Sequence, residues 1–349
     1  MASSKTPRPG SARSLSTSAG GWRGLARRSL RRLPGPLEAR VLAATGRHPA
    51  RTVDIGALDD LLAEAARLFE TSEDEARRFL RGFSLAPPPA RPADPFSRAY
   101  AEWVFALYRA VSGRPGYSTD NEHSPFDVSE ALVRPYPHST GSAIVLGEEL
   151  MARGFIVKAL GLTPPARLVE FGSGWGNLTL DLVRLGFEVT AVEIEPRFCE
   201  LLEARARDLP GLRVVESSML EFRAEGPFDA AIFYEAFHHC ADHLALLERL
   251  HALVRPGGRI LFAAEPVAPM PYPWGPRLDG YSLWSTRTYG WLELGFDEGY
   301  FAQALHRTGW TATRRRDPAA SPLADVIVAT ALRDGGPADG PGRPPDGVS

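Results

Sequence analysis

The sequence predicts an α/β fold, a doubly wound and mostly parallel sheet of seven strands preceded by an N-terminal helical region. Two observations lead to this class. From residue 166 onward short apolar runs alternate with helical stretches, and strands separated by helices require right-handed crossovers and a parallel sheet covered on both faces. A glycine-rich turn, "FGSGWG", ends the first run, and such sheets bind ligands at the carboxyl ends of their strands.

Composition limits the class of protein. The 349 residues are 44% hydrophobic, which is enough for a substantial core, and the formal net charge of −2 gives no general attraction to nucleic acid or anionic membranes. Because only Cys199 and Cys240 are present, no disulfide framework is expected, and a reducing, cytoplasmic location fits better. No run approaches the roughly 20 apolar residues of a membrane-spanning helix.

The chain divides into four parts. Residues 1–52 are rich in Ser, Gly, Pro and Arg and poor in acids, which predicts a disordered basic tail, with a mitochondrial transit peptide as the alternative. Residues 53–160 form the helical region and residues 161–333 the α/β domain. Residues 334–349 cannot bury enough apolar surface to offset the entropy of ordering, so a second disordered tail is expected.

Four helices are predicted in the helical region. "GALDDLLAEAARLF" places leucines along one face, "EDEARRFLRGF" follows a capping box of Ser72 and Glu75, and "SRAYAEWVFALYRAV" is the third helix. The fourth covers about 142–160, with Ile144 and Leu150 among its apolar positions. The loops before it carry polar and aromatic groups, which either line the mouth of a site or only join two regions.

Strands and helices then alternate to the end of the α/β domain. The strands are "RLVEFG", "EVTAVEI", "LRVVES", "FDAAIFYEAF", "PGGRILFAAEPV", "TATRRR" and "ADVIVATAL". The helices are "NLTLDLVRLG", "PRFCELLEARARDL", "ADHLALLERLHALV" and "DEGYFAQALHRTGW". An insert rich in proline and aromatic residues, about 265–296, separates the fifth strand from the last of these helices.

The glycine-rich turn indicates the kind of ligand. Gly172, Gly174 and Gly176 lack a Cβ atom, so a ligand can touch the main chain there. A dinucleotide fingerprint requires a further glycine at the position of Asn177. Glu170, two residues before the first glycine, would repel a pyrophosphate but attract an ammonium group. The turn therefore favours a nucleoside that carries an amino acid over a dinucleotide.

Four ordered motifs resemble the class I S-adenosylmethionine-dependent methyltransferases, small-molecule branch, over about residues 160–330. They are "VEFGSGWG", "VTAVEIE", "FDAAIFYEAFHHCAD" and "LVRPGGRILF". The resemblance implies a Rossmann-like methyltransferase fold, S-adenosyl-L-methionine as cofactor, and Glu193 as the residue that binds both ribose hydroxyls. The family usually has an acid for the adenine amino group where Ser218 stands here, followed by Met219, so a neutral and weaker hydrogen-bond acceptor is expected.

The residues expected to bind the cofactor follow the first four strands of the α/β domain. They are Glu170, Gly172, Ser173, Gly174, Gly176, Asn177, Glu193, Ile194, Ser218, Met219, Tyr234 and Glu235. An aromatic face at Tyr234 or the carboxylate of Glu235 could hold the sulfonium or its amino-acid tail. The alternative for Tyr234 is ordinary packing.

Methyl transfer to a hydroxyl gains about 10²–10⁴-fold from a general base. His238 and His239 directly follow the fourth strand, where the methyl group should point, and histidine has a suitable pKa. We expect one of them to be the base, His238 ahead of His239; the alternative is that the pair is structural. Two adjacent histidines point in different directions on a helix, and no Cys or His cluster has ligand spacing, so no metal is expected.

The resemblance also implies that the aromatic insert covers the acceptor site, and we expect the N-terminal region to act with it as a lid. We expect Tyr136, His138, Tyr281 and Trp284 to contact a small-molecule substrate. The expected activity is O-methylation of a saccharide or a secondary metabolite. The alternatives are N- or C-methylation, or a catalytically silent module that binds a partner protein or RNA through the basic tail. No DNA or membrane partner is expected, and the oligomeric state stays open, with a homodimer as one alternative.

Overall fold

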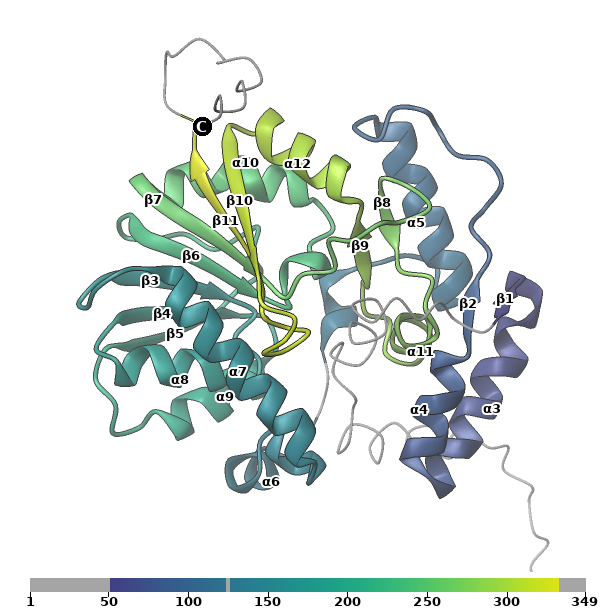
Figure 1. Cartoon of the computed structure of the whole chain (residues 1–349), viewed down its shortest axis with the longest axis horizontal. Helices are drawn as coiled ribbons and strands as arrows, with labels where there is room; N and C mark the ends of the chain where they lie inside the picture. Colours follow the sequence, from purple (N-terminus) through teal and green to yellow (C-terminus); the bar gives the residue numbers. More distant parts are fainter. Residues whose placement is uncertain (1–50, 124–125, 333–349) are drawn as a thin grey trace, which may run out of the picture.

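A seven-stranded sheet forms the centre of this computed structural model, which describes residues 51–123 and 126–332 (Figure 1). The strand order is β10-β11-β7-β6-β3-β4-β5, and only β11 runs antiparallel to its neighbours. The strands are β3 (Arg167–Phe171), β4 (Glu188–Glu193), β5 (Leu212–Glu216), β6 (Phe228–Tyr234), β7 (Val254–Ala263), β10 (Trp310–Arg316) and β11 (Asp325–Ala331). The predicted mostly parallel, Rossmann-like sheet of seven strands is confirmed.

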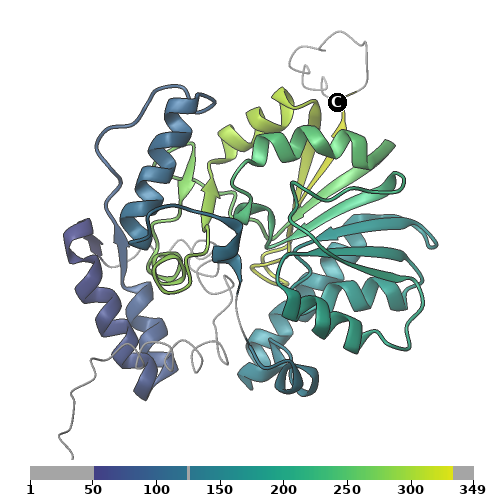
Figure 2. The ribbon, with the colours of Figure 1, turned by 180° about the vertical axis from the view of Figure 1, so that it is seen from behind.

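Helices cover both faces of this sheet (Figures 1 and 2). They are α7 (Ala143–Leu160), α8 (Asn177–Arg184), α9 (Pro196–Arg205), α10 (His243–Leu253) and α12 (Glu298–Arg307). Successive residues of β3 point to opposite faces, so Leu168 packs in one core with α7 and α8. Val169 and Phe171 pack in the other core with α10 and α12. Both faces are therefore dry, which explains the nearly continuous apolar runs in the strands.

Helix α7 packs on the sheet with a different face from the one that its apolar residues Ile144 and Leu150 predicted. Ile144 and Leu150 are 74% and 51% exposed, whereas Glu149, Arg153 and Ile156 are buried. The two buried charged side chains have polar partners, because Glu149 accepts a hydrogen bond from the Tyr234 hydroxyl and Arg153 donates to Asp181 and to the carbonyl of Asn177. The inner face of α7 thus combines apolar residues with buried charged groups whose hydrogen-bonding needs are met.

The N-terminal helices and the insert at 265–296 pack together as one layer beside the sheet, which we call the cap (residues 51–112 and 265–296) (Figure 1). Its elements are β1 (Arg51–Val53), η1 (Ile55–Ala57), α3 (Leu58–Thr71), α4 (Glu73–Arg81), β2 (Phe83–Leu85), α5 (Arg98–Ser112), β8 (Trp274–Pro276), α11 (Gly280–Thr288) and β9 (Leu294–Phe296). Leu58, Leu62 and Leu80 share a core with Tyr281 and Leu283 of the insert. The cap therefore folds from two segments that are distant in the sequence.

The ends of the predicted parts need one correction. The expected tails at 1–52 and 334–349 lie outside the described residues except for Arg51 and Thr52, which form β1 and pair with β2 in parallel. Both side chains are exposed, so no apolar pattern marked this short strand. Ser72 caps α4 as expected, since its hydroxyl accepts the backbone N–H of Glu75. Within 51–123 and 126–332, none of the helices has the length and apolar character needed to cross a bilayer.

The predicted substrate residue Trp284 belongs to the core of the cap. Its side chain is 6% exposed, and its ring centroid lies 5.1 Å from that of Phe69 in α3. Trp284→Ala should lower the free energy of unfolding by about 3 kcal/mol or more, because a large buried ring is lost. Urea denaturation measures this change. The control Leu185→Ala, at a 52% exposed position, should change stability by less than about 0.5 kcal/mol, and an equally stable Trp284→Ala protein would contradict the assignment to the core.

Candidate active site

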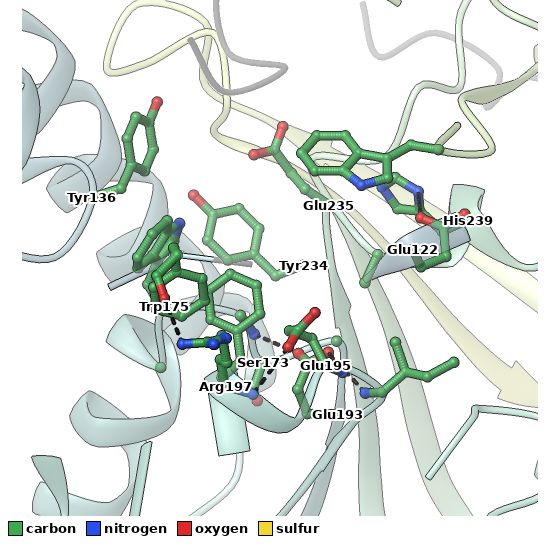
Figure 3. Close-up of a pocket in the computed structure, with 18 of the residues that line it drawn as sticks. Glu122, Tyr136, Ser173, Trp175, Glu193, Glu195, Arg197, Tyr234, Glu235 and His239 are labelled. Atoms are coloured by element: carbon green, nitrogen blue, oxygen red, sulfur yellow. Dashed lines mark hydrogen bonds and ion pairs between the residues drawn. The ribbon is translucent and has the colours of Figure 1, made fainter. Parts of the chain in front are cut away.

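A cavity of about 1320 Å³ lies at the carboxyl ends of β3, β4, β5 and β6, between the sheet and the cap (Figure 3). The lining residues within 170–178, 192–200 and 217–220 form what we call the turn side, and the lining residues within 117–122, 235–241 and 277–293 form the cap side. Figure 3 shows Trp175 and Tyr136 on the opposite side of the cavity from Glu122 and His239. Tyr234 lies between the two groups.

Most of the predicted site residues line this cavity. They are Glu170, Gly172, Ser173, Gly174, Gly176, Asn177, Glu193, Ile194, Ser218, Met219, Tyr234 and Glu235, together with His239, Tyr136 and Tyr281. Three predicted residues lie elsewhere. His238 and Trp284 are buried outside the cavity lining, and His138 is exposed in the short helix η3 (His138–Thr140).

The three glycines of the turn have different reasons to be glycine. All have positive φ, at 68°, 49° and 72° for Gly172, Gly174 and Gly176, a region that side chains with a Cβ atom disfavour. A Cβ atom at Gly172 would lie 2.6 Å from the Cβ of Ala236, and one at Gly176 would lie 2.4 Å from Leu202 Cδ1. Only at Gly174 is the surrounding space open within 4 Å. Space for the expected approach of a ligand to the main chain is thus open only at Gly174 of the three, whereas protein packing requires glycine at the other two.

Glu193 ends β4 with its carboxylate held against the turn. One oxygen accepts the N–H of Gly174 at 2.8 Å, and the other accepts the N–H of Ile194 at 2.8 Å and of Glu195 at 3.2 Å. Burial raises the pKa of Glu193, and these three backbone donors oppose that increase because they stabilise the charged form. Three of roughly four lone-pair sites are occupied, so the carboxylate can still accept a hydrogen bond from a ligand hydroxyl.

Glu170 is buried behind the turn and is bonded to a hydroxyl. Thr179 Oγ1 donates to Glu170 Oε2 at 2.6 Å, and the residue is 2% exposed. Burial is the main reason that its pKa rises from 4.5 to about 7, partly offset by the Thr179 hydrogen bond. The expected fixed anion is therefore a group that titrates near neutral pH.

Aromatic and polar contacts close the turn side in a way that the sequence did not indicate. The rings of Phe126, Trp175 and Phe198 lie with centroids 4.7–5.0 Å apart, and Arg197 donates to the carbonyl of Phe126 at 2.9 Å. These contacts bring the short helix α6 (Val128–Val133) against α9.

The hydroxyl of Ser218 already has hydrogen-bond partners within the protein, because it donates to Glu221 at 3.0 Å and accepts the Glu221 N–H at 3.2 Å.

His238 is not positioned to act as the base that the sequence analysis expected. Its side chain is 1% exposed, and its Nδ1 lies 2.8 Å from Glu265 Oε2. Burial, followed by repulsion from His239, lowers the pKa of His238 to about 3, although Glu265 opposes this. Glu265 also accepts the backbone N–H groups of Ala236 and Phe237 at 2.8 Å and of His238 at 3.2 Å. The imidazole is thus a buried, neutral part of the loop that follows β6.

His239 does line the cavity, but as a cation. Its Nδ1 lies 3.1 Å from Glu122 Oε2 in the short helix η2 (Thr119–Glu122) (Figure 3). Burial alone would lower the pKa of His239, but Glu122, with Glu293 and Glu265 at longer range, outweighs burial and raises the pKa to about 9. A histidine that is already protonated at neutral pH cannot accept a proton. Both histidines were misjudged because their carboxylate partners are distant in the sequence.

The cap side contains charged residues that the sequence analysis missed. Arg277 and Glu293 of the insert line the cavity with Trp291. Arg277 Nη2 lies 3.0 Å from Asp279 Oδ2, and Arg277 Nη1 lies 3.7 Å from Glu293 Oε2. Among residues 51–123 and 126–332, no cluster of three or more His, Cys, Asp or Glu side chains could hold a metal ion.

The pKa of Glu170 near 7 predicts how the ligand-free protein responds to pH. Between about pH 4.5 and 7 the unfolded chain releases this proton while the folded chain keeps it, so stability falls as pH rises, by about 3 kcal/mol in total. Urea denaturation at about pH 5 and pH 7.5 should show this loss in the wild type. Glu170→Gln should reduce the loss, and equal pH slopes for the two proteins would contradict the assignment.

Comparison with known proteins agrees with this geometry. Residues 169–262 match the family model described as a methyltransferase domain. The chain is 28% identical over 141 residues to demethylmenaquinone methyltransferase from Mycobacterium sp. (strain KMS), which covers 40% of this chain and 59% of that protein. It is 32% identical over 105 residues to ubiquinone biosynthesis O-methyltransferase from Xanthomonas campestris pv. campestris (strain B100), covering 29% of this chain and 43% of that protein. The chain thus spans about half the length of these relatives.

Among solved structures, the Burkholderia thailandensis 1,6-didemethyltoxoflavin-N1-methyltransferase is 22% identical, with a TM-score of 0.44 over 71% of this chain and 95% of that chain. The assignment itself rests on the family match and on the two curated relatives. It agrees with the ordered motifs, the first three of which contribute residues to the lining of the cavity. Residues 169–262 of this chain thus match a methyltransferase domain, and the α/β domain is similar in sequence to methyltransferases that act on small molecules.

Proposed function

We propose that this chain transfers a methyl group from S-adenosylmethionine to a small molecule bound on the cap side of the cavity. The observation that carries the proposal is the Glu193 carboxylate, held at the turn by three backbone N–H groups with capacity left for a ligand hydroxyl. The open space at Gly174 lies beside this carboxylate, because the Gly174 N–H is one of its three donors. Both features suit a nucleoside with a free ribose.

The turn side offers partners for each part of that cofactor. Glu193 would hold the ribose, Ile194, Ser218 and Met219 would surround the adenine, and Glu170 with the turn would face the amino-acid end. When bound, the sulfonium supplies an already activated methyl group. The protein's own contribution is then to align the acceptor with that methyl carbon and to exclude water.

The acceptor that the cap side suits best is a hydroxyl on a ring-bearing metabolite, such as a secondary metabolite or a saccharide. Tyr117, Tyr281 and Trp291 line this side and offer surfaces on which a ring can stack. Arg277 and the His239–Glu122 pair can orient polar substituents. The names of the matched relatives, both for quinone-related methyltransferases, also support a small-molecule acceptor.

A nitrogen acceptor is the second candidate. Of the described residues on the cap side, the carboxylates Glu122, Glu235 and Glu293 face two cations, Arg277 and His239. An excess of negative charge attracts a protonated amine. Fragmentation of the methylated product by mass spectrometry would distinguish O-methylation from N-methylation.

Glu193→Gln should weaken S-adenosylmethionine binding by about 10- to 100-fold, because hydrogen bonds to a charged group are worth about 1.5–3 kcal/mol. Isothermal titration calorimetry measures the affinity. Glu203→Gln, an exposed change on α9, is the matched control and should bind like the wild type. An unchanged affinity for Glu193→Gln would remove the main support for the proposal.

The activity itself is tested with methyl-labelled S-adenosylmethionine and bacterial metabolite extracts, followed by mass analysis of what gains the label. We expect one or a few small molecules to become labelled in the presence of the wild-type chain. Calorimetry with NAD provides the contrast: binding of NAD alone would indicate a dehydrogenase, and binding of neither compound would favour a silent module.

A further inference from the structure

We propose that Glu293 accepts the proton that the acceptor hydroxyl or amine loses during methyl transfer, and that Arg277 and His238 position it. This assignment rests on the proposed function. The base is then a carboxylate of the insert and not the expected histidine. The insert lies outside the four motifs that resemble the methyltransferase family.

Glu293 is a buried carboxylate that faces the cavity. It directly precedes β9, is 5% exposed, and belongs to the cavity lining. Its Oε2 lies 3.7 Å from Arg277 Nη1 and 3.8 Å from His238 Nε2. Both distances exceed those of hydrogen bonds. The carboxylate is therefore attracted by its neighbours without being saturated by them, and it can accept a proton from a molecule in the cavity.

The other carboxylates nearby are more fully engaged. Glu122 pairs with His239 at 3.1 Å and accepts the N–H of Leu292 at 2.9 Å. Glu265 accepts from three backbone N–H groups and from His238 Nδ1, and it lies outside the cavity lining. Glu235 lines the cavity and is the direct rival, so it is included in the test below.

His238 and Arg277 favour opposite protonation states of Glu293. Because His238 is neutral and its Nδ1 donates to Glu265, its Nε2 carries the lone pair. This buried Nε2 has no hydrogen-bond partner among the described residues. It can therefore accept a hydrogen bond from the O–H of a protonated Glu293. Arg277 stabilises the ionised form instead. The pair thus holds a carboxyl group that can exist in both states.

The charges around Glu293 agree with this role. Burial raises its pKa, His239 and Arg277 lower it, and Asp279 and Glu122 raise it. The charged and titratable groups that surround it come from η2, from the loop after β6, from the end of β7 and from the insert. They are Glu122, Glu235, His238, His239, Glu265, Arg277 and Asp279.

The step balances in atoms and charge. The O–H or N–H bond of the acceptor breaks, and its proton forms the Glu293 carboxylic acid. The acceptor oxygen or nitrogen uses its electron pair to bond the methyl carbon, and the carbon–sulfur bond breaks with its pair left on sulfur, giving neutral S-adenosylhomocysteine. One cation and one anion disappear together, which favours the reaction in a buried site.

The test compares the wild type with Glu293→Gln, Glu235→Gln and the exposed control Glu225→Gln, using the metabolite that the labelling experiment identifies. Single-turnover methyl transfer is measured from about pH 6 to pH 9, and S-adenosylhomocysteine affinity is measured by calorimetry. Glu293→Gln should lose about 100-fold or more in rate and keep the affinity for S-adenosylhomocysteine. Its residual rate should continue to rise with pH, because the acceptor must then ionise unaided, whereas the wild-type rate levels off. Glu225→Gln should match the wild type.

The outcomes separate the two proposals. If the wild type binds the cofactor but labels no metabolite, the proposed function fails and this assignment fails with it. If the wild type transfers the methyl group and Glu293→Gln matches it, or if only Glu235→Gln loses the rate, the assignment alone is overturned. Should Glu293→Gln not fold, Glu293→Asp, which retains a carboxylate on a shorter side chain, should be slower than the wild type with the same pH plateau. An undiminished rate for Glu293→Asp would then overturn the assignment.

Discussion

The hydrogen bond between the Gly174 N–H and the Glu193 carboxylate joins the turn after β3 to the end of the neighbouring strand β4. The rest of the site depends on this connection, because it fixes the loop conformation around a buried charge that backbone donors stabilise. Glu265, just after β7, plays the same part for the loop after β6, because its carboxylate accepts hydrogen bonds from three backbone N–H groups of that loop. Two buried carboxylates thus hold the two neighbouring loops, after β3 and after β6, that line the cavity side by side.

Constraints of a different kind shape the cap. Its core combines side chains of α3 and α4 with Leu283 and Tyr281 of the insert, and the N–H of Leu85 donates to the carbonyl of Leu278 at 2.8 Å. Hydrophobic burial therefore binds two distant segments into one layer, in which the insert lines the cavity and the N-terminal segment supports the insert from behind. Helix α7, which the sequence analysis grouped with the N-terminal helices, packs on the sheet instead.

Local patterns explain what could be predicted from the sequence. The strands and the glycine turn follow from apolar periodicity and short spacing, and the position of Glu193 follows from the resemblance of its motif to the family. The roles of the histidines could not be predicted this way, because Glu265 and Glu122 set the charge of His238 and His239 from remote parts of the chain. The same limit applies to α7, whose buried Glu149 becomes acceptable only through Tyr234. Residues whose protonation or burial depends on distant partners are the ones that periodicity misjudges.

The two-segment origin of the cap constrains how substrate range can diversify in such a protein. The turn side is built almost entirely from the sheet and its loops, whereas Arg277, Tyr281 and Glu293 on the cap side stand on an insert whose core is completed by α3 and α4. If the insert were exchanged for that of a homologue, the new insert would no longer fit the leucines of α3 and α4 that pack against it. Recombination that alters acceptor choice must therefore carry the segments that encode residues 51–112 and 265–296 together, while the nucleoside-binding turn side, encoded between them, can remain untouched.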